Sequence, residues 1–249
     1  MARAFLRSFE AHSHSYVTKM IDKNAPTGRV RSSRHSAAQT PGRRMMPLSL
    51  LIRIVMSTVV VVRKNGVACI AADSLTSYGD LKLSSRYDPH SEKIQTFGST
   101  HLAIVGSAAH TLVIESLLNK SDFFPDFSNR AEIFKTFSLV HAELKENYFL
   151  NTKDDEEDPY ESSHIDSLAV NEHGIFGIYA MREVYEYSTF WATGSGSPYA
   201  LGAMHAVYDR YDSAESVAEA GVMAGAEFDN ASSAPITMRT VTLKQEDKE

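Results

Sequence analysis

One segment of the sequence, residues 57–73, predicts two strands joined by a tight turn and constrains the chain around it. Its first half is dominated by β-branched residues and its second half by small apolar ones. Asn65-Gly66 between them is the dipeptide preferred in a type I′ turn. About seven residues on each side of that turn can pair in antiparallel register, so Ser57 is expected to lie near Asp73. A hydroxyl and a carboxylate would then share one rim of a sheet.

The charge is unevenly distributed and divides the 249-residue chain in two. Residues 1–56 contain ten Arg and Lys but only Glu10 and Asp22 as acidic residues, a net charge of +8; because the whole chain carries −6, residues 57–249 carry −14. An acidic body argues against a nucleic-acid partner, which requires a basic face. The single cysteine, Cys69, excludes an intrachain disulfide and fits a reducing, cytoplasmic compartment, and its apolar neighbours predict a buried thiol.

Residues 1–56 are rich in Ser, Arg and His and are interrupted by Pro and Gly, so we expect a disordered extension. Three interpretations remain open: a targeting segment, a removable propeptide, or a start assigned too early, with Met56 as the true first residue. The apolar run from Pro47 to Val55 is interrupted by an arginine and is too short to span a bilayer, so we expect no membrane anchor. Either of the last two interpretations would expose Ser57 at the start of a domain that covers residues 57–249.

The hairpin resembles the first two strands of the proteasome β-type N-terminal nucleophile hydrolases. This family includes the bacterial HslV peptidase and the proteasome homologues of betaproteobacteria, and the chain looks most similar to the latter. In the family a Thr at the mature N-terminus opens the first strand, and an Asp follows sixteen residues later. Asp73 follows Ser57 by sixteen residues, so the resemblance implies that Ser57, rather than Thr58, occupies the nucleophile position. Ser offers the same oxygen as Thr without the methyl group that restricts the rotamer.

Two further segments match the pattern of the family. Residues 91–97 predict a third strand, and the resemblance implies that Lys93 near its start lies beside the nucleophile and is held there by Asp73. An apolar strand at 101–105 runs into Gly106-Ser107-Ala108-Ala109-His110-Thr111, which looks like the family's Gly-Thr-Ala-Ala-Asp-Thr stretch. The resemblance implies that the N–H of Gly106 donates to the oxyanion, with the N-terminus of a helix behind it.

The remaining periodicity predicts further helices and strands. We expect helices over about Asn129–Leu150, after Pro198 and over Ala214–Glu227, and strands over Ile165–Val170, Ile175–Met181, Glu183–Ala192 and up to Leu243. This order of sheet, two helices, sheet and helices is the order of a four-layer αββα sandwich, an α+β fold of two mostly antiparallel sheets flanked by helices. The acidic run at 153–159 lacks the glycine and alternating ligands of a calcium loop, so it predicts a solvated loop.

The segment 191–202 predicts a strand that turns through Gly194-Ser195-Gly196 into a helix. A phosphate-binding turn is disfavoured, because Tyr199 stands where a dinucleotide-binding pattern needs its third glycine and no Walker lysine follows. The resemblance instead implies that Ser195 hydrogen-bonds near the N-terminal amine. It also implies that Asp229 and Ser232, three residues apart, help to hold that amine.

These matches imply a self-compartmentalising endopeptidase that cleaves unfolded proteins, in which the α-amine of Ser57 takes the proton of its own hydroxyl. No metal or organic cofactor is expected, since the ten His residues show no clustered ligand spacing. The resemblance also implies two kinds of partner: further copies of the chain in stacked rings and an ATP-dependent unfoldase. A noncatalytic ring scaffold and a nonproteolytic amidase of the same superfamily remain open alternatives.

Overall fold

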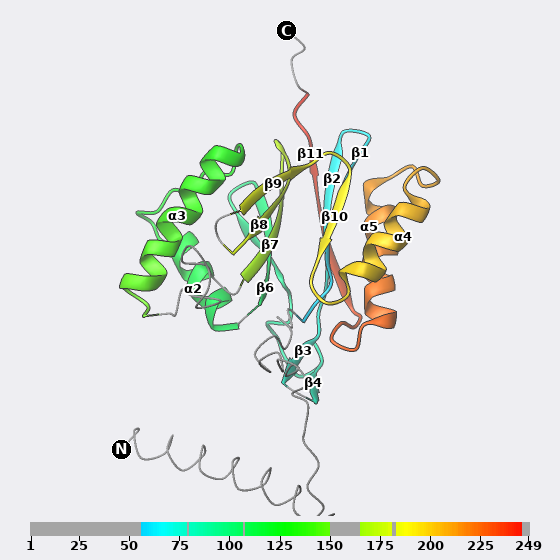
Figure 1. Ribbon diagram of the computed structural model, residues 1–249, viewed down its shortest axis with the longest axis horizontal. Coiled ribbons are helices and arrows are strands. Elements are labelled where there is room, and N and C mark those ends of the chain that lie inside the picture. The colour runs from blue at the N-terminus through cyan, green and yellow to red at the C-terminus, as the bar shows by residue number, and fades with distance from the viewer. Residues whose placement is uncertain (1–55, 79, 107, 150–164, 181–182, 246–249) are drawn as a thin grey trace, which may run out of the picture. The chain divides into compact units, whose positions relative to one another are not determined.

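The computed structural model describes residues 56–78, 80–106, 108–149, 165–180 and 183–245. Apart from Met56, the predicted extension lies outside these ranges, as does the predicted acidic loop at 153–159. The centre of the described domain consists of two antiparallel sheets that face each other (Figure 1). The first sheet has the order β10-β1-β2-β11, formed by Phe190–Thr193, Val59–Lys64, Val67–Asp73 and Ile236–Thr242. The second has the order β5-β6-β7-β8-β9, formed by Ile94–Phe97, Thr100–Gly106, Ile165–Asn171, Gly174–Tyr179 and Glu183–Tyr187.

Helices cover the outer face of each sheet, so the predicted four-layer αββα sandwich is confirmed (Figure 1). Helices α2 (Ala108–Leu118) and α3 (Arg130–Glu146) pack on the second sheet, and α4 (Ser197–Val207) and α5 (Ala214–Phe228) pack on the first. A third apolar cluster, with Val61, Ile70 and Leu168 among its members, fills the space between the sheets. Both faces of the central strands are therefore buried, which accounts for their nearly continuous apolar sequence.

The predicted hairpin between β1 and β2 is confirmed in type and register. Asn65 and Gly66 both have positive φ, at 50° and 76°, which the primed turn requires. Val59 pairs with Ala72, and the N–H of Asp73 donates to the carbonyl of Thr58 at 3.1 Å. The start of the first strand therefore lies beside the end of the second. Cys69 is fully buried in β2, as predicted, and burial raises the pKa of its thiol to about 12, so the thiol is unreactive.

The single strand predicted at Glu183–Ala192 is wrong, because this stretch forms two strands that belong to different sheets. Strand β9 pairs with β8, whereas β10 pairs with β1, and the chain crosses between the sheets at residues 188–189. The N–H of Arg63 donates to the carbonyl of Thr189 at the crossing, at 2.6 Å. No Gly or Pro marks the break in the sequence, so the local pattern reads as one continuous strand.

Two smaller differences lie at the ends of elements. Helix α3 ends at Glu146 with Asn147 as its C-cap, earlier than the predicted end at Leu150, which lies outside the described residues. The polar segment after Asp73 forms a short two-stranded sheet that was not predicted, with β3 at Thr76–Tyr78 and β4 at Leu81–Leu83. Three-residue strands with few apolar residues carry too little alternation to be detected from sequence.

Candidate active site

A cluster of Ser57, Asp73 and Lys93 forms where the two sheets meet at one end. Ser57 lies two residues before β1 and Asp73 ends β2 of the first sheet, whereas Lys93 immediately precedes β5 of the second. Lys93 Nζ donates to Ser57 Oγ at 2.8 Å and to Asp73 Oδ1 at 2.6 Å. The Asp73 side chain is fully buried, and that of Lys93 is 13% exposed. The ammonium is thus held between a hydroxyl and a carboxylate with little access to water.

The carboxylate of Asp73 is held by four donors. Besides Lys93, its Oδ1 accepts the N–H of Thr58 at 2.9 Å, and its Oδ2 accepts the N–H groups of Leu75 and Ser233 at 3.0 and 3.1 Å. These hydrogen bonds fix the position of both carboxylate oxygens. Asp73 therefore provides a fixed negative charge that orients the ammonium toward Ser57.

The protonation of Lys93 is shifted by its surroundings. Burial lowers the pKa of Lys93 below its ordinary value of 10.5, and the carboxylates of Asp73 and Asp229 oppose part of that shift. A cation that donates directly to Ser57 Oγ favours the deprotonated hydroxyl, since it balances the negative charge on oxygen. The arrangement can therefore activate the Ser57 hydroxyl as a nucleophile.

A second cluster surrounds the backbone nitrogen of Ser57. The N–H of Ser57 donates to Ser195 Oγ at 3.3 Å, and Ser195 Oγ donates to Asp229 Oδ2 at 2.7 Å. Ser232 Oγ donates to the same carboxylate oxygen at 2.6 Å. Asp229 comes directly after helix α5 as its C-cap, and Ser195 lies in the turn that leads into α4. The helices on the outside of the first sheet thus position the groups around the Ser57 nitrogen.

Six of the seven residues selected from the sequence meet in these two clusters. The seventh, Gly106, lies at the end of β6 with a positive φ of 140°. Within the part of the chain that the structure describes, Gly106 makes no hydrogen bond to Ser57 or to Lys93. Its role as an oxyanion donor stays a prediction.

Thr58 was not selected from the sequence, yet it contacts both clusters. Its N–H donates to Asp73, while its Oγ1 lies 2.7 Å from Ser232 Oγ. Because Ser232 donates its proton to Asp229, Thr58 is the donor in that pair. Thr58 is fully buried, and its side chain points to the opposite side of the strand from Ser57. The alternation of side chains along a strand predicts this direction. The partner of the hydroxyl could not be predicted in the same way, because Ser232 lies 174 residues away in sequence.

The glycines of the Gly194-Ser195-Gly196 turn allow the chain to approach Ser57 closely. Gly194 has a φ of 94°, and a Cβ placed there would collide with the carbonyl of Ser57. The N–H of Gly196 donates to that same carbonyl at 3.2 Å. The turn was recognised from the sequence for its serine, whereas the steric requirement for its glycines appears only in the tertiary structure.

In the described ranges, no three His, Cys, Asp or Glu side chains come together in a way that could hold a metal ion. The helices of those ranges include none with the length and apolar character needed to cross a membrane.

Comparison with known proteins identifies relatives among solved structures. No protein-family model and no curated protein matches the chain. Thiobacillus denitrificans BPH in complex with epoxomicin is 43% identical, with a TM-score of 0.70, and the match covers 76% of this chain and 100% of that one. BPH without the ligand is 44% identical over the same shares, with a TM-score of 0.71. HslV from Trypanosoma brucei is 18% identical over 74% of this chain and 99% of that one, with a TM-score of 0.57, and it shares the fold.

Proposed function

Because the chain belongs to the proteasome β-type family of N-terminal nucleophile hydrolases, which includes the betaproteobacterial proteasome homologue BPH, we propose that it is an endopeptidase with Ser57 as its nucleophile. One observation carries the proposal: Lys93 Nζ lies 2.8 Å from Ser57 Oγ while Asp73 holds it from the other side. An ordinary surface lysine would keep its ammonium in water, because burying a charge costs free energy. The buried position of Lys93 between a carboxylate and a hydroxyl therefore favours a functional role.

The first step of the proposed reaction is activation of the hydroxyl. The α-amine of Ser57, once it is free, has an ordinary pKa of about 8 and takes the hydroxyl proton directly or through one water. The protonated amine would face Ser195 Oγ, whose own hydroxyl is oriented by Asp229. The carboxylate of Asp229 then balances the positive charge on the amine, while Lys93 balances the negative charge that develops on Ser57 Oγ.

Attack and release complete the reaction. Ser57 Oγ attacks the carbonyl carbon of a peptide bond, and the N–H of Gly106 is proposed to donate to the resulting oxyanion. The amine returns its proton to the leaving nitrogen, which leaves an ester between Ser57 and the acyl part of the substrate. A water activated by the same amine hydrolyses this ester, restoring the free hydroxyl.

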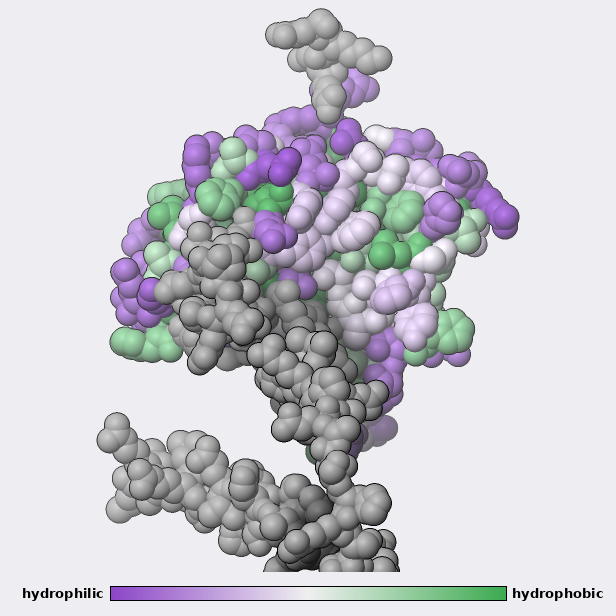
Figure 2. Space-filling model, viewed as in Figure 1, coloured by the Kyte–Doolittle hydropathy of each residue, from purple (hydrophilic) through white to green (hydrophobic). Residues whose placement is uncertain are grey.

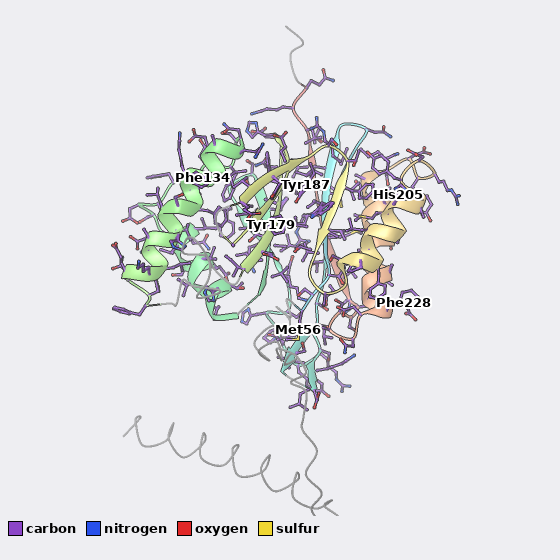
Figure 3. All side chains as sticks on the ribbon, viewed as in Figure 1. Met56, Phe134, Tyr179, Tyr187, His205 and Phe228 are labelled. Carbon is purple, nitrogen blue, oxygen red and sulfur yellow. The ribbon has the colours of Figure 1, made fainter. Side chains whose placement is uncertain are left out.

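The proposal requires that the peptide bond between Met56 and Ser57 be absent from the active protein. A peptide nitrogen has no useful basicity, so the general base exists only when Ser57 is the first residue. We propose that residues 1–56 are a removable propeptide or an addition upstream of the true start, and that residues 57–249 form the peptidase domain. Met56 lies beside the β3–β4 hairpin (Figure 3), where Ser77 Oγ donates to its sulfur at 3.0 Å.

We further propose that copies of this chain assemble into stacked rings that enclose the active sites and receive unfolded proteins from an ATP-dependent unfoldase. Support for self-association comes from the outer surface of α4 and α5. Tyr199 and Phe228 pack against each other with ring centroids 5.8 Å apart, yet remain 46% and 67% exposed. Met223 on the same helix pair is also exposed. Clustered apolar residues on a surface are typical of an interface.

The proposed function is tested with protein that begins at Ser57, assayed on fluorogenic peptides. We expect hydrolysis by this protein and none by its Ser57→Ala variant, whose assembly is checked by native mass spectrometry. Epoxomicin, with which T. denitrificans BPH forms a complex, serves as a second probe, and we expect it to inhibit hydrolysis. Full activity in Ser57→Ala would contradict the assignment of the nucleophile. A correctly started, assembled protein without peptidase activity would favour the scaffold or the amidase.

A further inference from the structure

Lys93 approaches Ser57 from the end of an irregular stretch of chain. Residues 84–93 form neither helix nor strand, and Lys93 is the last residue before β5. Its ammonium must nevertheless stay between Ser57 Oγ and Asp73 Oδ1, which lie at the ends of strands of the other sheet. A displacement of about 1 Å between reacting groups can reduce a rate by about a hundredfold. The backbone at Lys93 therefore needs anchors on both sides.

The two neighbours of Lys93 in the chain provide these anchors. Ile94 is buried in the apolar cluster between the sheets. Glu92 forms an ion pair with Arg239 of β11, in which Arg239 Nη2 donates to Glu92 Oε1. Strand β11 is the edge strand beside β2, and β2 ends at Asp73. Glu92 is thus fastened to the sheet of the proposed nucleophile, while Ile94 fixes the start of β5.

The guanidinium of Arg239 is itself held in place. Arg239 lies opposite Ile70 of β2 and two residues before Val241, which packs against the cluster between the sheets. Side chains alternate along a strand, so Arg239 leaves β11 on the side that faces the second sheet. Its Nη1 donates to the carbonyl of Met238 at 2.9 Å while Nη2 reaches Glu92. A planar guanidinium with two fixed nitrogens gives the Glu92 carboxylate a defined position.

Arg239 also balances a charge that would otherwise disturb the cluster. Glu92 is next to Lys93 in the chain, and a carboxylate without a cation of its own would compete with Asp73 for the ammonium. Burial, and the charge of Arg239 in addition, lower the pKa of the His101 imidazole in β6. His101 is therefore neutral at pH 7 and brings no second cation to Glu92. Pairing with Arg239 leaves the ammonium of Lys93 to Asp73 and Ser57.

The ion pair is too exposed to matter mainly for stability. The side chains of Glu92 and Arg239 are each 41% exposed, and pairs of this kind contribute little to the free energy of unfolding. We propose that Glu92 and Arg239 are positioning residues, which hold Lys93 where its ammonium contacts the Ser57 hydroxyl. The inference rests on the proposed peptidase function and adds to it two residues that act through Lys93.

The test changes the two residues singly and together in protein that begins at Ser57, with kcat and KM measured on a fluorogenic peptide. Glu92→Gln and Arg239→Gln should each lower kcat by about tenfold and leave KM within about twofold of the parent. The midpoint of thermal unfolding should stay near that of the parent. The double variant Glu92→Arg with Arg239→Glu reverses the ion pair and should regain most of the lost kcat. A parental kcat in both single variants, or a reversed pair no faster than they are, would overturn the inference.

The matched control is Glu172→Gln, which breaks an ion pair with Lys244 that is exposed to a similar degree. The N–H of Leu243 donates to the carbonyl of Gly66 in the hairpin turn, so this pair lies at the opposite end of β1 and β2 from Ser57. Figure 2 shows hydrophilic residues at that upper end of the domain, where the chain leaves β11 toward its C-terminus. Glu172→Gln should leave kcat unchanged.

A titration of Lys93 separates this inference from the proposed function, because it requires no hydrolysis. Nitrogen NMR of lysine-labelled protein follows the Lys93 ammonium, whose signal is identified by its loss in Lys93→Arg. Burial lowers the pKa of Lys93 below 10.5, so Arg239→Gln, which releases the side chain toward water, should raise that pKa toward 10.5. This rise in a protein that cleaves no peptide would support the positioning role and contradict the peptidase. A Lys93 titration identical to that of the parent would overturn the inference.

Discussion

Lys93 Nζ and Ser57 Oγ lie 2.8 Å apart although the two residues come from different sheets and 36 positions separate them in the chain. The contact depends on the packing of one sheet on the other, because Ser57 precedes β1 and Lys93 precedes β5. Asp73, at the end of β2, completes the arrangement from the first sheet. The proposed chemistry therefore requires the full sandwich rather than a single element.

Lys93→Ala is expected to reduce kcat/KM by a factor corresponding to about 2 to 4 kcal/mol, as for the loss of one donor to a developing oxyanion. The reason is that Ser57 Oγ loses the cation that favours its deprotonated form. Steady-state kinetics on a fluorogenic peptide measures the effect. The matched control is Lys135→Ala, which removes an exposed lysine paired with Glu132 on α3 and should leave the rate unchanged. A Lys93→Ala rate within threefold of the parent would show that this lysine has no catalytic role.

The pH dependence of the reaction is expected to have an alkaline limb below pH 10.5. Burial lowers the pKa of Lys93, so its ammonium loses a proton at a lower pH than an ordinary lysine, and catalysis falls as pH rises through that pKa. The acidic limb reflects the α-amine, which must be neutral to act as a base and has an ordinary pKa of about 8. A kcat/KM profile from pH 6 to 11 measures both limbs. An alkaline limb that is identical in Lys93→Arg, which keeps its charge throughout this range, would contradict the assignment to Lys93.

Thr58→Val is expected to lower the free energy of unfolding by about 1 to 3 kcal/mol, because Ser232 Oγ loses its donor in a buried site while the side-chain shape is kept. Urea denaturation measures the change. Hydrolysis should fall far less than in Ser57→Ala, since Thr58 points away from the nucleophile. Thr58→Ser retains the hydroxyl and should restore most of the stability relative to Thr58→Val. A free energy of unfolding in Thr58→Val equal to that of the parent would show that the hydroxyl contact does not stabilise the domain.

A protein that retains residues 1–56 is expected to be inactive toward peptides. Its Ser57 nitrogen is a peptide nitrogen, so the hydroxyl is present without its general base. Blocking cleavage between Met56 and Ser57 retains the extension on the protein. Intact mass spectrometry checks that the extension is present, and a peptide assay measures hydrolysis. The control is the same domain started at Ser57, which should hydrolyse the peptide. An undiminished rate from protein whose mass still includes the extension would defeat the N-terminal nucleophile mechanism.

Gly194→Ala is expected to destabilise the domain and reduce hydrolysis, because a Cβ would collide with the Ser57 carbonyl at a φ of 94° that Ala avoids. Thermal unfolding and peptide hydrolysis measure the two effects. Gly202 in α4 offers a control, since a Cβ there meets no atom within 4 Å. Gly202→Ala should raise stability by about 0.5 to 1 kcal/mol through helix propensity. Equal stabilities for the two variants would show that the turn accommodates a Cβ at position 194 without loss of folding free energy.

The nearness of Ser57 and Asp73 could be predicted from sequence because it depends on local pairing. Asn65-Gly66 forms the turn, and the turn fixes the register in which β1 and β2 pair. That register brings Ser57, before the first strand, beside Asp73 at the end of the second. The roles proposed for Lys93, Ser195, Asp229 and Ser232 depended on resemblance, since no local pattern relates them to Ser57. The spacing of these residues in the chain indicates the family that the sequence resembles. Their contacts around Ser57, in contrast, form only when the chain is folded.

Sequence alone thus determined the hairpin and the order of the layers, because β-propensity, turn chemistry and helical periodicity act between near neighbours. The candidate residues beyond the hairpin came from the resemblance to the family. The tertiary structure alone decided two features: the break of 183–192 into strands of two sheets, and the Thr58–Ser232 contact. Each joins segments that are distant in the chain, and such contacts form only when the sheets pack on each other and bury the residues between them. Neighbouring residues carry no signal of that packing, which is why these features could not be predicted.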